Sequence, residues 1–179
     1  MISGTGVLTK TGTATLSIGG NNTYSGGTVY APTSTAAIIT YSQNNAFGTG
    51  LFTVQGQGEI RTGGNLTLPN NFQFNIGTIM QYRTTGANTI TLSGNIAGSG
   101  SLNKTGNGTL RLDGTLTYTG STTITGGFIR SIKTNGASTA TATFQSAGLS
   151  LVVSFNVAPP SGTTTSVFFK ELQVKLTQQ

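Results

Sequence analysis

The chain contains nearly the same segment twice: GTGVLTKTGTATLSIGG at Gly4–Gly20 and GSGSLNKTGNGTLRLDG at Gly98–Gly114. At an offset of 94 residues, 2–30 falls on 96–124 without a gap, and fourteen of the twenty-nine pairs are identical. An internal repeat of this kind is typical of a solenoid. The offset is too long for one coil but suits four or five coils of about 20 residues each.

Short runs between the two blocks alternate apolar and polar residues. They include NLTLPNNFQF (65–74) and NTITL (88–92), each bounded by glycine or asparagine. Such alternation predicts short strands with one buried side, and no 3.6-residue period favours a helix. The apolar residues at alternate positions are Leu66, Leu68, Phe72, Phe74, Ile90 and Leu92.

These strands predict an all-β solenoid with a parallel sheet arrangement. Strands of successive coils pair at about 4.8 Å, and alternate side chains fill one narrow core. Glycine and asparagine suit the corners, where positive φ is needed, and threonine suits the outer face. The solenoid is expected over residues 1–134, with blocks 2–30 and 96–124 as its recognisable repeats.

Residues 135–179 have a different texture and predict a C-terminal β-hairpin or small β cap. Two strands, Leu149–Val157 and Ser166–Leu176, are expected on either side of a Pro159–Pro160 turn. Val167–Leu176 has a short helix as its alternative, since Phe168, Leu172 and Leu176 are four residues apart. The segment is expected to cap the solenoid or to contact another subunit.

The composition excludes several kinds of site. The chain has no cysteine and no histidine, so it lacks disulfides, thiolate metal sites and the commonest general base. Its net charge is +6, but the basic residues are scattered singly and do not interleave with aromatics. A nucleic-acid groove is therefore not expected. The basic residues are Lys10, Arg61, Arg83, Lys104, Arg111, Arg130, Lys133, Lys170 and Lys175.

Two residue types recur at equivalent places in the two blocks. Lys10 and Lys104 are expected to be surface charges that keep a flat β surface from self-association. The alternative is a ladder of cations that binds an anionic surface. Tyr24 and Tyr118 are expected to cover a corner of the core with the hydroxyl outward, or else to stack on sugars.

Catalysis is not expected, because titratable groups are too few. The acids are Glu59, Asp113 and Glu171. Glycoside hydrolysis needs two carboxylates about 5–10 Å apart, and nothing in the sequence places Glu59 and Asp113 together. Asp113 precedes a glycine and is expected in a turn. Glu59 is expected to be solvated beside Arg61. We therefore expect no enzyme, no catalytic residue, no cofactor and no metal site.

The shared features G-x-G-x-L-x-K-T-G, then T-L, then T-Y-S/T-G resemble the passenger-associated repeat of bacterial autotransporters. The resemblance covers about sixty residues in Ile2–Tyr30 and Ile90–Ile124. It implies a right-handed parallel β-helix used as a rigid, surface-exposed rod, with no catalytic residues. Similar repeats also occur in phage structural proteins.

The family pattern is not complete in this chain. MISGTGVLTK does not have the charged start and apolar stretch of a signal peptide, and no apolar stretch has transmembrane length. No barrel strands are recognisable. The first block lacks the strand that precedes Ile96, so its first coil is expected to leave an open edge. Another subunit would cover that edge, or the chain is a piece of a longer solenoid.

The leading hypothesis from the sequence is a non-enzymatic structural protein on the exterior of a virus particle, such as a phage decoration, cement or fibre subunit. A homotrimer and contacts with other virion proteins are expected. The alternative is a fragment of a secreted autotransporter-type surface adhesin, whose partner is a cell-surface glycan or protein. Neither hypothesis involves nucleic acid or membrane insertion. The candidate subunit contacts are Ile2, Val167, Phe168 and Phe169.

Overall fold

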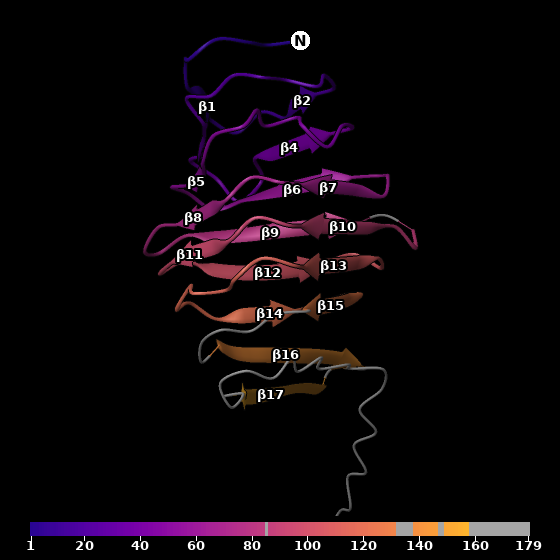
Figure 1. The fold of residues 1–179 in the computed structure, drawn as a ribbon. Helices are drawn as coiled ribbons and strands as arrows, with labels where there is room; N and C mark the ends of the chain where they lie inside the picture. Colours follow the sequence, from indigo (N-terminus) through magenta and orange to yellow (C-terminus); the bar gives the residue numbers. More distant parts are fainter. Residues whose placement is uncertain (85, 132–137, 147–148, 158–179) are drawn as a thin grey trace, which may run out of the picture.

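The computed structural model describes residues 1–84, 86–131, 138–146 and 149–157, which form a stack of about six coils (Figure 1). All regular elements in these ranges are strands, and none of the described residues forms a helix that could cross a bilayer. The strands make three sheets that share one core.

Each sheet takes one strand from successive coils. Sheet A consists of β1 (Leu8–Thr11), β3 (Thr28–Ala31), β5 (Phe52–Val54), β8 (Phe72–Phe74) and β11 (Ile96–Gly98). Sheet B consists of β2 (Leu16–Ile18), β4 (Ile38–Tyr41), β6 (Gly58–Thr62), β9 (Ile79–Thr84), β12 (Ser101–Thr105), β14 (Thr122–Ile124), β16 (Ser138–Ser146) and β17 (Leu149–Val157). Sheet C consists of β7 (Leu66–Leu68), β10 (Thr89–Leu92), β13 (Thr109–Leu112) and β15 (Phe128–Ser131).

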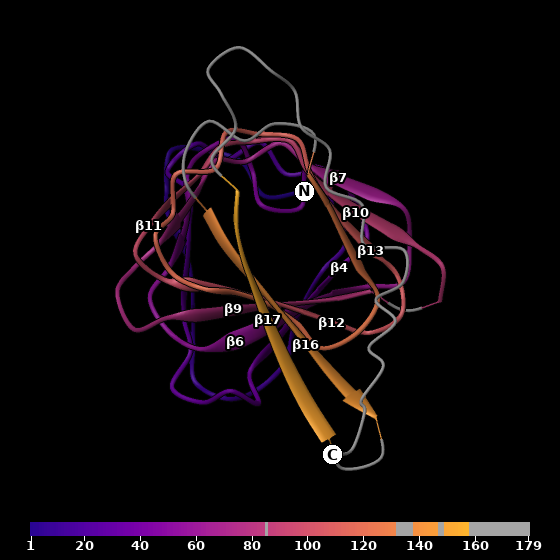
Figure 2. The same ribbon diagram turned by 90° about the horizontal axis from the view of Figure 1, so that it is seen from below.

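The coils stack in parallel, which confirms the predicted solenoid. In sheet A, Leu8 pairs with Thr28 and Thr28 with Phe52, so one coil takes 20 residues and the next takes 24. Figure 2 looks along the axis from the C-terminal side, and the chain runs anticlockwise from β11 through β12 to β13 as it approaches the viewer. This is the sense of a right-handed coil, as the family resemblance implies.

The core consists of the inward side chains of all three sheets. Five of the six alternating residues that the sequence indicated are buried, including Leu68, Phe74, Ile90 and Leu92 at 0% exposure, and Leu66 is partly buried. Aromatic rings run along the axis: the Phe47 and Phe52 ring centroids lie 4.8 Å apart, and those of Phe52 and Phe72 lie 5.1 Å apart. Dispersion and burial along this column hold adjacent coils together.

Asparagine and glycine shape the corners, as predicted. The side-chain Oδ1 of Asn71 accepts a hydrogen bond from the Asn95 backbone N–H (2.9 Å), and Asn95 Oδ1 accepts one from the Thr115 N–H (3.0 Å). Each asparagine side chain thus provides a hydrogen-bond acceptor for a backbone N–H at the corner of the next coil. Gly94 lies so close to the carbonyl of Asn70 that a Cβ there would overlap its oxygen.

The two repeat blocks occupy different faces of the solenoid. Within each block one coil has the same register, since Leu8 pairs with Thr28 and Leu102 with Thr122. However, β1 and β3 belong to sheet A, whereas β12 and β14 belong to sheet B. Equivalent strands of the two blocks therefore lie in neighbouring sheets. The repeat is thus a local unit that can form on more than one face of the solenoid.

At the N-terminal end, β1 and β2 are the outermost described strands of sheets A and B. The Ile2 N–H donates to Asn22 Oδ1 (2.7 Å), and its carbonyl accepts the Thr23 N–H (2.9 Å). Met1, Ile2 and Val7 are exposed there.

The C-terminal end contains a hairpin that the sequence did not indicate. Leu149–Val157 is a strand as expected, but its described partner is β16, which pairs antiparallel from Ser138 with Val157 to Ser146 with Leu149. β16 in turn pairs in parallel with β14. The hairpin thus extends sheet B. The Pro159–Pro160 turn, Ser166–Leu176 and the proposed boundary at 134/135 lie outside the described residues.

Candidate functional surface

The repeated lysines point into the solenoid, so both sequence interpretations of them were wrong. Lys104 is fully buried and Lys10 is 7% exposed. Lys104 Nζ donates to the carbonyls of Thr105 (2.6 Å), Gly106 (2.9 Å) and Gly126 (3.2 Å). Three carbonyls satisfy the three donors of an ammonium group, and no carboxylate is needed for this.

The K-T-G motif encodes this arrangement. Lys10 Nζ likewise donates to the carbonyls of Thr11 (2.5 Å) and Gly12 (3.2 Å). Gly12 and Gly106 have φ of 67° and 71°, a conformation that glycine adopts without strain. The chain turns there so that its carbonyls face back toward the lysine. The motif therefore serves the fold.

Lys104 gives the stability a predictable pH dependence. Burial lowers the pKa of its ammonium to about 8, below the value of about 10.4 in an unfolded chain. Between these values the unfolded chain binds the proton more tightly, so stability rises with pH. Urea titrations at pH 7 and pH 9.5 measure the free energy of unfolding of the wild type and of Lys104→Met. The difference between wild type and variant should shift in favour of the wild type by about 1–2 kcal/mol from pH 7 to 9.5. A difference independent of pH would contradict this.

The repeated tyrosines are also interior, and the expectation of outward hydroxyls was wrong. Tyr24 and Tyr118 are 2% and 4% exposed. The Tyr24 hydroxyl bonds Thr28 Oγ1 at 2.6 Å, and the Tyr118 hydroxyl bonds Thr122 Oγ1. Burial raises the pKa of both phenols. Their burial leaves no ring face for sugar stacking.

The structure does not bring the two described carboxylates together. Glu59 is in β6 of sheet B, while Asp113 follows β13 in sheet C, two coils further along. Glu59 accepts from Arg61 Nε and Nη2, and its side chain is 11% exposed, so the expectation that it is solvated was wrong. Asp113 Oδ1 accepts from Arg111 Nε at 2.7 Å. The described residues contain no group of three or more potential His, Cys, Asp or Glu metal ligands.

The predicted subunit contacts are only partly within the described ranges. Ile2 is 46% exposed at the N-terminal end, where its role as a contact stays a prediction. Val167, Phe168 and Phe169 lie outside the described residues. The homotrimer also stays a prediction.

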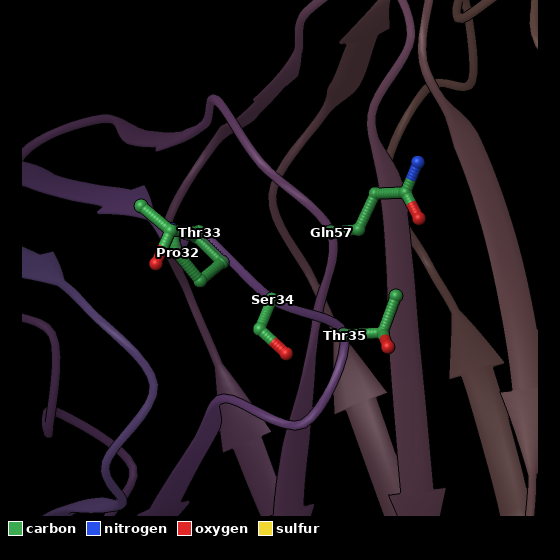
Figure 3. Close-up of a pocket in the computed structure, with 5 residues that line it drawn as sticks. All are labelled: Pro32, Thr33, Ser34, Thr35 and Gln57. Carbon is green, nitrogen blue, oxygen red and sulfur yellow. The ribbon is translucent and has the colours of Figure 1, made fainter.

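One hollow of about 440 Å³ lies beside the β3–β4 loop (Figure 3). Four consecutive residues of that loop, 32–35, line it together with Gln57 of the following coil. These side chains are hydroxyls, an amide and a proline ring, so the lining offers neutral hydrogen bonds and no acid or base. The residues are Pro32, Thr33, Ser34, Thr35 and Gln57.

Coil stacking also brings together arginines that are far apart in the sequence. Arg61 lies in register with Arg83 on sheet B, and Arg111 with Arg130 on sheet C. The description of the basic residues as scattered is therefore wrong in space. In the sequence, the two arginines of each pair are separated by about the length of one coil, which could have indicated that they lie side by side. Only a known register between coils determines which residues are neighbours.

The two blocks differ at most of their outward positions. Their shared leucines, lysines and tyrosines face inward, whereas outward positions change: Thr9 corresponds to Asn103, and Ser17 to Arg111. The repeat therefore specifies the scaffold, and any recognition falls to outward residues. The fold and this surface define the class of protein: a right-handed parallel β-solenoid with a polar outer face.

Two segments of the chain, residues 8–29 and 102–130, match the family model of the passenger-associated-transport-repeat. The chain thus carries two copies of this repeat, which confirms the resemblance seen in residues 2–30 and 96–124. No curated protein and no solved structure matches the chain. The family match favours the passenger-type alternative, and no comparison supports the virion hypothesis.

Proposed function

We propose that this chain is a segment of the passenger of an autotransporter-type protein and acts as an adhesive rod at the cell surface or in the secreted protein. The observation that carries the proposal is the match of both repeat segments to the passenger-associated-transport-repeat. The repeat lies within a continuous solenoid, the architecture expected of such a passenger.

The physical properties of the solenoid suit a non-enzymatic rod. Backbone ladders and one continuous core extend over successive coils, so stability depends on nearest-neighbour contacts. The described carboxylates are both occupied by arginines, which leaves them poorly placed for acid–base chemistry. The function then depends on what the outer faces contact.

Location is the property to test first. An antibody against this chain should label intact cells of the source organism or detect the chain in the culture medium, while an antibody against a cytoplasmic protein labels only lysed cells. The same reading frame should also encode a membrane barrel. Recovery of the chain with purified virus particles, or in the cytoplasm alone, would overturn the proposal.

A further inference from the structure

The outer face of sheet B carries polar residues that are aligned from coil to coil. One row of outward residues runs Ser17, Thr40, Arg61, Arg83, Thr105 along the axis, each in register with the next. A second row beside it runs Glu59, Gln81, Asn103, Thr123. The face therefore presents hydroxyl, amide and guanidinium groups at the spacing of the coils, about 4.8 Å.

Arg61 and Arg83 give this face an unbalanced positive charge. Like charges on neighbouring strands are unfavourable unless something lies between them or neutralises one. Glu59 neutralises Arg61 through two hydrogen bonds. Among the described residues, no carboxylate lies within ion-pair distance of Arg83, which is exposed. An anion placed against Arg83 would remove the imbalance.

The face offers few interactions to a nucleic acid. Single-stranded nucleic acid binds largely by stacking bases on aromatic rings. The outward residues of β2, β4, β6, β9, β12 and β14 include no aromatic ring, because Tyr41 and Tyr82 point into the core with 4% and 0% exposure. Flanking threonine, glutamine and asparagine side chains instead match the hydroxyl groups of a sugar polymer.

We infer that the outer face of sheet B binds an acidic polysaccharide that lies along the solenoid axis. Arg83 pairs with carboxylate or sulfate groups through its planar fork. Thr40, Gln81 and Asn103 hydrogen-bond the sugar hydroxyls. The inference rests on the proposed function, because a rod outside the cell meets such polymers, and charge complementarity selects the acidic class.

Binding of the purified chain to polygalacturonate and heparin tests this, with dextran as the neutral polymer and poly-dT as the nucleic acid. Both acidic polymers should bind, and more weakly as salt rises. Arg83→Gln should weaken binding about tenfold, and Arg83→Lys should weaken it less. Arg130→Gln removes the same charge from sheet C and should change affinity less than about twofold. Circular dichroism and melting temperature verify folding of each variant.

Three results would overturn the inference: no binding to either acidic polymer, equal losses in Arg83→Gln and Arg130→Gln, or poly-dT binding as tightly as the polysaccharides. The second result would indicate an effect of net charge alone. None of these measurements depends on where the chain is located in the cell. A failure here is therefore distinct from a failure of the surface-labelling experiment.

Discussion

Replacing Phe72 by alanine should lower the free energy of unfolding by about 3–5 kcal/mol. The side chain is 1% exposed, and its ring centroid lies 5.1 Å from that of Phe52 and 6.3 Å from that of Tyr82. It thus contacts one ring in the preceding coil and one on the next strand of the chain. Alanine would leave a cavity that backbone ladders on three sides prevent from collapsing. Urea unfolding followed by circular dichroism measures the change.

Phe128 provides a matched control for this substitution. It is in β15 on sheet C, and 51% of its surface is exposed. Phe128→Ala should change the free energy of unfolding by less than about 0.5 kcal/mol. Similar losses in the two variants would mean that the aromatic column does not hold the coils together.

Gly94→Ala is expected to destabilise the protein by about 3 kcal/mol or more. A Cβ at Gly94 would overlap the carbonyl oxygen of Asn70 on the preceding coil, and one at Gly114 would overlap that of Gly94. The overlap is with backbone, which moves only if the rungs separate and the ladder hydrogen bonds around the corner break. Thermal and urea unfolding both report this loss.

Gly64→Ala serves as the control, because a Cβ there meets only Leu66 Cγ, at 3.8 Å. Its backbone φ is not in the left-handed region, so alanine fits without strain. We expect a change within about 0.5 kcal/mol, or slight stabilisation through reduced freedom of the unfolded chain. An equally small change in the free energy of unfolding for Gly94→Ala would contradict the close approach of the coils at this corner.

The sequence predicted the parts of the fold that depend on local pattern. Alternation at Leu66, Leu68, Phe72 and Phe74 identified the strands and their buried side, and the internal repeat indicated stacked coils. Glycine and asparagine marked the corners. These signals are local, so they do not require knowledge of which coil lies beside which.

Register was not predictable in the same way. Coil lengths alternate between 20 and 24 residues along sheet A and range from 18 to 23 along sheet B, because corner loops differ in length. No periodic signal encodes those lengths. The pairing of Arg61 with Arg83 depends on that register. The same dependence explains why the repeat blocks lie on different faces. The partner of Leu149–Val157 was also missed, since β16 is composed largely of threonine and alanine, which carry little apolar signal.

The lysines and tyrosines of the repeat were misplaced for a different reason. A lysine is almost never fully buried without a partner, so the surface was the reasonable expectation for Lys104. The structure satisfies its ammonium with three backbone carbonyls. A sequence shows which charged side chains could pair with a lysine. It does not show which backbone carbonyls face the lysine, because their direction depends on the conformation of the folded corner.

The most direct test of the account is a disulfide between neighbouring coils. The chain has no cysteine, so Arg61→Cys with Arg83→Cys introduces one pair, whose Cα atoms would lie about 4.8 Å apart, within the range for a disulfide. Arg61→Cys with Thr105→Cys spans two rungs, about 9.6 Å, which is too far. Mild oxidation followed by mass spectrometry should find the disulfide in the first variant alone. Efficient cross-linking in the second variant and none in the first would contradict the stacking of coils on which the fold and the proposed binding face depend.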